Sequence, residues 1–239
     1  MIIDFYTTII DNYGDAGFSF NLAKSLLKEY RNLEIRYFID DKNLFLKLSG
    51  NKKINKLSVF NLKDIKTTPP SKNIFNFFDR KIDFEFLHQF DFEINLINFS
   101  YFSLDKNIKN IHNTFYTSKN IKITHFVPSL LSDGGGVIIN NKKNLSKTDF
   151  FKDKNDVFYN KIWVSVFCYK ETFNEIKNEF KKYKDTIFFV FDNKTSGENI
   201  VNMPFLTMYN YLDFISVCDK NIVRGENSLV GALVSNKPF

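Results

Sequence analysis

Two aspartates stand four residues apart in a short segment that also holds two glycines. The segment reads Asp11-Asn12-Tyr13-Gly14-Asp15-Ala16-Gly17, and it follows an apolar run at residues 2–10. A pair of carboxylates suits a general base with its orienting partner, or a site for a cationic substrate. Each aspartate also has a structural role open to it, because Asp15 could cap the next helix and Asp11 could anchor a turn.

A second candidate for chemistry lies near the end of the chain. There, a short apolar run is followed by Arg224-Gly225-Glu226-Asn227-Ser228. Free N–H groups at a helix N-terminus bind phosphate, Gly225 permits close approach, and Arg224 can form charge-assisted bonds to a diphosphate. Ser228 adds a hydroxyl. The alternative is that Glu226 only complements the helix dipole and that Arg224 is a surface charge.

The elements around both segments predict parallel sheets. Residues 2–10 and 34–39 are typical of strands, and residues 18–30 repeat apolar side chains at helical spacing. Strand, glycine-containing loop, helix and strand form the opening unit of a Rossmann-like sheet, where ligands bind at the carboxyl ends of strands. After residue 160 the pattern restarts, with strands at 162–169, 186–191 and 221–223 and helices at 171–183, 209–218 and 226–234.

The rest of the chain completes a two-domain prediction. Further strands are expected at 57–62, 92–99 and 121–127, whereas residues 75–90 give mixed signals and receive no assignment. Residues 140–160 are polar and rich in Lys, Asn and Asp. We therefore predict a Rossmann-like domain at 1–145, a linker at 146–160 and a second Rossmann-like domain at 161–239. This α/β pattern is typical of GT-B glycosyltransferases, which bind substrate in the cleft between the halves. A dinucleotide enzyme is less favoured because no G-x-G-x-x-G follows a strand.

Composition narrows the class of protein. With 239 residues, of which 44% are hydrophobic and 25% charged, the chain can bury sizeable cores. The net charge is +6, but Lys and Arg are scattered, which argues against a nucleic-acid-binding face. Cys168 and Cys218 lack metal-site spacing and are expected to be reduced core thiols. No apolar run approaches the roughly 20 residues of a membrane span, and the N-terminus lacks signal-peptide features. We expect a cytoplasmic protein with no membrane or nucleic-acid partner.

Several motifs, in order along the chain, resemble the EarP family, the protein-arginine rhamnosyltransferases that modify translation elongation factor P (EF-P). They are residues 10–17, His125-Phe126-Val127-Pro128 before Gly134–Gly136, Val164-Ser165-Val166-Phe167-Cys168-Tyr169, the run 218–228 and Asn236-Lys237-Pro238-Phe239. The resemblance implies a GT-B fold and an inverting transfer of L-rhamnose from dTDP-β-L-rhamnose to an arginine side chain of EF-P. The resemblance further implies that this modification activates EF-P for translation of polyproline stretches. The resemblance implies no metal or other cofactor.

The resemblance also implies roles for single residues. Asp15 falls on the family's catalytic aspartate, Asp11 on its supporting aspartate and Glu226 on its functional glutamate. The implied donor-binding residues are Asn12, Tyr13, Gly14, Gly17, Phe167, Tyr169, Phe205, Met208, Arg224, Gly225, Asn227 and Ser228. The N-terminal domain would hold EF-P, and the C-terminal domain would hold the donor.

Three departures from the family pattern keep alternatives open. The family has Asp at the position of Asn227 and Gln at the position of Met208, so a charge and an amide are lost here. Family members also continue beyond Lys-Pro-Phe, so the C-terminal domain is expected to be incomplete. The alternatives are a related nucleotide-sugar glycosyltransferase with another donor or acceptor, and a non-catalytic binder of EF-P.

Overall fold

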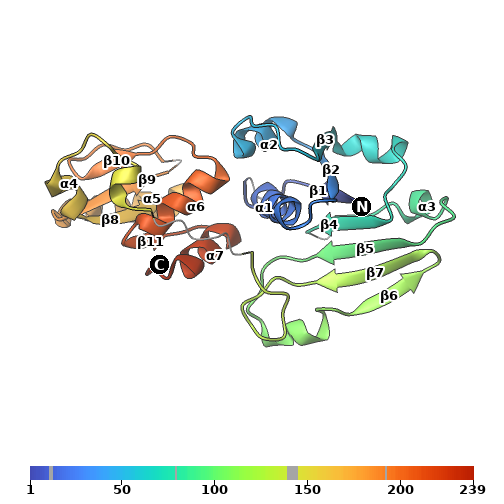
Figure 1. The fold of residues 1–239 in the computed structure, drawn as a ribbon. Helices are drawn as coiled ribbons and strands as arrows, with labels where there is room; N and C mark the ends of the chain where they lie inside the picture. The colour runs from blue at the N-terminus through green and yellow to red at the C-terminus, as the bar shows by residue number, and fades with distance from the viewer. Residues whose placement is uncertain (11–12, 79, 139–144, 192) are drawn as a thin grey trace. The chain divides into compact units, whose positions relative to one another are not determined.

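The computed structural model describes residues 1–10, 13–78, 80–138, 145–191 and 193–239 (Figure 1). Its contacts divide the chain into two compact units, an N-terminal unit, Met1–Ile138, and a C-terminal unit, Ile139–Phe239. Each unit has a predominantly parallel sheet with helices beside it, which is an α/β architecture.

The N-terminal unit is built on a seven-stranded sheet in the order β3-β2-β1-β4-β5-β7-β6. Its strands are β1 (Ile2–Thr7), β2 (Glu34–Ile39), β3 (Leu57–Asn61), β4 (Asn73–Phe77), β5 (Ile94–Phe99), β6 (Phe115–Ser118) and β7 (Ile121–Phe126). All neighbours pair in parallel except β6 with β7. The other elements are α1 (Tyr13–Glu29), α2 (Lys42–Ser49), α3 (Phe84–Leu87) and the 3₁₀ helices η1 (Leu62–Thr67) and η2 (Lys106–Asn110).

Phenylalanine supplies much of the core between α1 and this sheet. The Phe5 ring lies 5.2 Å from that of Phe75 and 5.1 Å from that of Phe77. Phe77 in turn stacks on Phe99 at 4.9 Å, and Phe18 of α1 meets both of these rings. Packed rings contribute large buried area and favourable ring geometry. The abundant phenylalanines of this half are therefore largely structural, and they fix α1 against the carboxyl ends of the strands.

The C-terminal unit has a four-stranded parallel sheet in the order β10-β9-β8-β11. Its strands are β8 (Ile162–Val166), β9 (Thr186–Val190), β10 (Ile200–Asn202) and β11 (Lys220–Ile222). Its helices are α4 (Asp156–Asn160), α5 (Lys170–Ile176), α6 (Met208–Val217) and α7 (Glu226–Ser235), with the 3₁₀ helices η3 (Lys147–Asp149) and η4 (Lys177–Lys182). Helices α6 and α7 approach closely, because a Cβ on Gly231 would lie 2.7 Å from Leu212.

The segment predicted to be a linker, residues 146–160, packs within the C-terminal unit. It forms η3 and α4, and the rings of Phe151 and Phe158 lie 5.5 and 5.4 Å from the ring of the buried Trp163. The linker prediction relied on the polar composition of this stretch, but its few aromatic side chains are favourably buried in a core. The aromatic residues of this segment are thus part of the hydrophobic core of the C-terminal unit.

Lys147 anchors this segment to the sheet. Its Nζ lies 2.7 Å from an oxygen of Asp219 and donates to the Lys161 carbonyl at 2.8 Å. The same carboxylate oxygen accepts the backbone N–H of Trp163 at 2.8 Å. Burial raises the pKa of Asp219, but Lys147 and the Trp163 N–H lower it more, so the net pKa lies below its ordinary value. The ionised pair therefore stabilises the fold.

We expect Lys147→Met to lower the free energy of unfolding by about 1–2 kcal/mol, because the pair is only partly shielded from water. Trp163 is the one tryptophan of the chain, so its fluorescence in a urea titration reports on this unit. Lys152→Met changes an exposed lysine nearby and serves as the control. The difference should shrink below about pH 4, where the unfolded carboxyl and then the folded one protonate. Equal midpoints for the two variants at neutral pH would contradict this role.

Candidate active site

The side chain of Asp15 is held in the first turn of α1, the helix that comes after β1 in the chain. It is only 3% exposed, and its Oδ2 accepts the backbone N–H of Ile10 at 2.7 Å. Asp15 lies in the first turn of α1, where the helix dipole favours a negative charge. A buried carboxylate with a fixed orientation is suited to accept a proton from a bound substrate.

Helix α1 begins earlier than the sequence predicted. The glycine segment was expected to be a loop with the helix starting near Phe18, but α1 starts at Tyr13, so Gly14 and Gly17 are helical. Asp15 explains the difference. Its carboxylate accepts the backbone N–H of Ile10, and its negative charge is favourable in the first turn of a helix. Gly14 is exposed, and no atom outside its chain neighbours and its own helix backbone lies within 4 Å of the place where its Cβ would be. A Cβ at this position would therefore meet open space beyond the helix itself.

Some predicted residues of this loop lie outside the described part of the chain. These are Asp11 and Asn12, and of Tyr13 only the backbone is described. Their proposed roles stay predictions.

Two buried residues hold the backbone of the first turn of α1 by hydrogen bonds, and the sequence did not single them out. Ser19 Oγ donates to the Asp15 carbonyl at 3.0 Å and lies 2.5 Å from the hydroxyl of Tyr37 on β2. Both side chains are fully buried, and burial raises the pKa of Tyr37 to about 12. In the sequence, the feature that could have indicated this support is a serine four residues after Asp15, on the helix face that is buried. This neutral network fixes the backbone that carries the carboxylate.

In the C-terminal unit, Arg224 lies at the carboxyl edge of the sheet beside two aromatic rings. The guanidinium carbon is 4.5 Å from the ring centre of Phe167 and 4.6 Å from that of Tyr169. These residues meet because β8 and β11 are parallel neighbours, so Phe167, Tyr169 and Arg224 all follow the carboxyl ends of their strands. Cation–π contacts with two rings limit the orientations of the guanidinium, whose N–H donors all lie in its own plane.

The turn after Arg224 brings the backbone into the start of α7. Gly225 precedes the helix with φ +75° and ψ 167°, and it is exposed. The sequence predicted that Ser228 offers its hydroxyl to the donor. In the structure Ser228 is 4% exposed, and its hydroxyl donates to the carbonyls of Arg224 and Gly225. Ser228 thus ties the turn to the helix. Glu226, the first residue of α7, is half-buried.

Gly225→Ala should destabilise the C-terminal unit by about 1–3 kcal/mol, because this φ/ψ region is nearly restricted to glycine. Differential scanning calorimetry measures the effect. Gly14→Ala is the matched control, since Gly14 is helical with open space at its Cβ position, and alanine there should not lower the melting temperature. An unchanged transition for Gly225→Ala would show that the turn tolerates a side chain.

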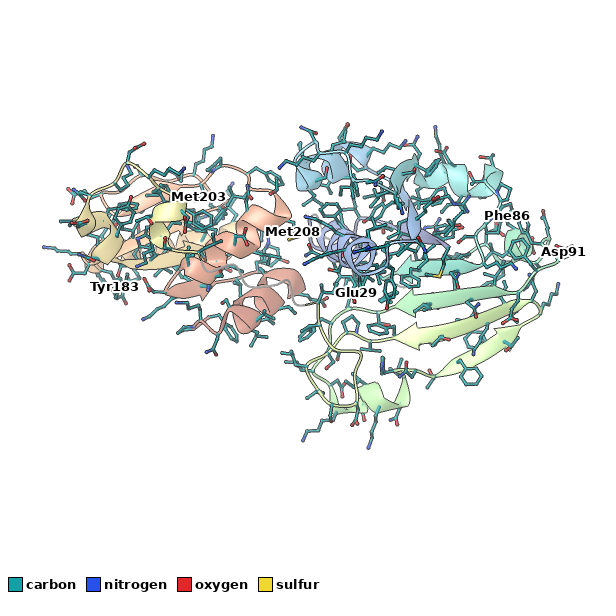
Figure 2. The ribbon with its side chains drawn as sticks, viewed as in Figure 1. Glu29, Phe86, Asp91, Tyr183, Met203 and Met208 are labelled. Atoms are coloured by element: carbon teal, nitrogen blue, oxygen red, sulfur yellow. The ribbon has the colours of Figure 1, made fainter. Side chains whose placement is uncertain are left out.

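The remaining predicted donor residues follow β10 or lie in α7. Phe205 is 48% exposed in the segment between β10 and α6. Met208 is the first residue of α6 and only 7% exposed, so it contributes mainly to packing (Figure 2). Asn227 lies in the first turn of α7, and its side chain is outside the described part of the structure.

Among the described residues, His, Cys, Asp and Glu side chains do not gather in a group of three that could hold a metal ion. In the same residues, the longest apolar helical stretches fall short of a membrane span.

The family described as "Elongation-Factor P (EF-P) rhamnosyltransferase EarP" matches residues 3–202 and 174–239, which together include both strand–helix junctions. The chain belongs to the EarP family. It is therefore a glycosyltransferase, as the sequence motifs predicted. A comparison with curated proteins gives no match.

Solved structures confirm the GT-B fold of this EarP-family chain. A structure of S. aureus MnaA with UDP has a TM-score of 0.54 at 14% identity, covering 99% of this chain and 78% of MnaA. A protein described as a UDP-N-acetylglucosamine 2-epimerase from Listeria monocytogenes has a TM-score of 0.53 at 12% identity, covering 99% of this chain and 77% of that one. At such identities the similarity shows the fold alone, and the family assignment rests on the sequence match.

Proposed function

We propose that this protein transfers L-rhamnose from dTDP-β-L-rhamnose to an arginine side chain of EF-P, with inversion at the sugar carbon. The family match over residues 3–239 carries the proposal, because it names both EF-P and the rhamnosyl group. EF-P is a translation factor, so the reaction would take place in the cytoplasm.

The N-terminal unit would bind the acceptor arginine through Asp15. A guanidinium stays protonated at neutral pH and is a poor nucleophile. A fixed carboxylate can orient it by paired hydrogen bonds and accept a proton as the new bond forms. The burial of Asp15 and its bond from Ile10 support this role, since both hold the carboxylate in one place. Asp11 and Glu226 would hold the guanidinium or Asp15 in position.

The C-terminal unit would bind the donor diphosphate through Arg224 and the first N–H groups of α7. The departing dTDP carries negative charge, which a guanidinium and a helix N-terminus can stabilise without a metal. The contacts of Arg224 with Phe167 and Tyr169 support this role, because they restrict the guanidinium before a ligand arrives. Gly225 would let the diphosphate approach the backbone.

In the transfer step, a guanidinium nitrogen of the acceptor attacks the anomeric carbon on the face opposite the diphosphate. The new C–N bond forms as the C–O bond to dTDP breaks, and dTDP leaves with the electron pair. The proton released by the guanidinium moves to Asp15. Attack from the opposite face accounts for the proposed inversion.

The test of this function is the intact mass of EF-P after incubation with the protein and dTDP-β-L-rhamnose. We expect EF-P to gain one deoxyhexose, and no gain when the donor is omitted. If EF-P binds but its mass does not change with donor present, the protein is a binder without this activity.

A second candidate function uses a different nucleotide sugar. Met208, which replaces the family's Gln, is buried and offers no amide to a base, and Asn227 lacks the family's charge. A thermal-shift panel separates the two candidates, because a ligand that binds the native state raises the melting temperature. We expect dTDP to give a larger shift than UDP or ADP at equal concentration. A shift with UDP and none with dTDP would favour the second candidate.

A further inference from the structure

The N-terminal unit contains a cavity of about 690 Å³ that none of the proposed catalytic or donor-binding residues lines. Its lining comes from Tyr6 of β1, from η1, and from residues 80–87, which include α3. Figure 2 labels Phe86 at the α3 end of this lining. The volume falls within the range of small-molecule sites, about 300–1,000 Å³.

Residues 80–86 alternate between partly buried and exposed positions. Arg80, Ile82, Phe84 and Phe86 are partly buried, while the three residues between them are exposed. Ile82, Phe84 and Phe86 pack against the hydrophobic cluster that contains Tyr6 and Leu87. The cavity wall is therefore an apolar row that begins with one arginine.

Arg80 is the partly buried cation of this lining. Its guanidinium carbon lies 5.8 Å from the ring centre of Tyr6. Among the described residues, no carboxylate forms an ion pair with Arg80, whereas Lys66 at the exposed rim pairs with Asp83 at 3.9 Å. Burial lowers the pKa of Arg80, and the electrostatic influence of Tyr6 and Asp40 only partly offsets this effect. A partly desolvated guanidinium gains most from an anion that brings its own hydrogen-bond acceptors.

The rim adds to the positive charge of the site. Lys63 and Lys81 also line the cavity and are exposed, and Glu85 is the acidic lining residue besides Asp83. The lining therefore carries a net positive charge above an apolar floor.

We propose that this cavity binds a small anion with an apolar body, such as an aryl-alkyl carboxylate or sulfonate, whose charged group meets Arg80. The apolar body covers Ile82, Phe84 and Phe86, and the anionic group replaces the water that Arg80 has lost. The proposal is independent of the glycosyl-transfer function, because it uses none of the same residues.

The probe is 8-anilinonaphthalene-1-sulfonate, whose fluorescence rises on binding, titrated into the whole protein with dTDP present throughout. Arg80→Met removes the charge and the N–H donors but keeps an unbranched, flexible apolar stem. Arg80→Lys keeps the charge, and Arg31→Met makes the matched change at an exposed position outside the cavity. Circular dichroism melts establish that each variant is folded. We expect Arg80→Met to weaken binding about tenfold or more, Arg80→Lys to weaken it less, and Arg31→Met to leave it unchanged.

A second measurement needs no variant. In wild-type protein, 3-phenylpropionate should displace the probe at about a tenth of the concentration that its neutral amide requires. Equal potency of acid and amide, unchanged probe affinity in Arg80→Met, or no probe binding to the wild-type protein would each overturn the proposal.

Discussion

Asp15→Asn is expected to lower the rate of transfer to EF-P by about 10²–10⁴-fold, the usual contribution of a general base. Asparagine has nearly the same size, and its amide oxygen can still accept the N–H of Ile10, so α1 should keep its start. The amide cannot accept a proton and carries no charge to orient a guanidinium. The loss should therefore fall on the rate of the chemical step and not on folding.

Two controls make this result specific. Affinity for dTDP, measured by calorimetry, should stay unchanged, because Arg224 and α7 belong to the other unit. Asp40→Asn makes the same substitution at another carboxylate that accepts a backbone N–H. Both Asp40 oxygens lie 3.2 Å from the backbone nitrogen of Ile9. It should retain most of the transfer activity. Normal transfer by Asp15→Asn would exclude Asp15 as the base.

Arg224→Met should weaken the affinity for dTDP by about 10–100-fold, the effect expected when hydrogen bonds to a charged group are lost. Methionine can keep the apolar packing against Phe167 and Tyr169, so the change isolates the charge and its N–H donors. Because donor binding is impaired, the KM for dTDP-rhamnose should rise.

Arg224→Lys refines this test. A lysine keeps the charge but lacks the planar fork that matches a diphosphate, so its affinity should lie between those of wild type and Arg224→Met. Lys184→Met changes an exposed lysine of the same unit and should bind dTDP normally. If Arg224→Met binds dTDP as tightly as Lys184→Met does, Arg224 is not a diphosphate ligand.

The sequence predicted the class of fold because its main strands and helices have clear periodicity. Strand β4 was missed, since Asn73–Phe77 merges into a phenylalanine-rich stretch that has no helical or alternating pattern of its own. Its Asn76 is buried and donates to Asn98 on the neighbouring strand at 2.9 Å, a pairing that only the folded sheet reveals. Helix α2 was also missed, although Asp41 caps it by accepting the Leu44 N–H at 3.0 Å.

For the candidate site, the sequence located both junctions but not the state of each side chain. That Asp15 is buried and bonded to Ile10 depends on how α1 follows β1. The Ser228 hydroxyl donates to the Arg224 carbonyl because of the turn that leads into α7, and Met208 is buried because of how α6 packs. The contact of Arg224 with two rings depends on β8 and β11 being neighbours, although about fifty-five residues separate them in the chain.

In the proposed function, this protein attaches rhamnose to an arginine of EF-P with Asp15 as the base. Tandem mass spectrometry of EF-P, after incubation with dTDP-β-L-rhamnose and either wild type or Asp15→Asn, tests it most directly. We predict one deoxyhexose on a single arginine side chain with the wild-type protein and almost none with the variant over the same time. A deoxyhexose on another type of side chain would contradict the proposed function, and equal modification by both proteins would exclude Asp15 as the base.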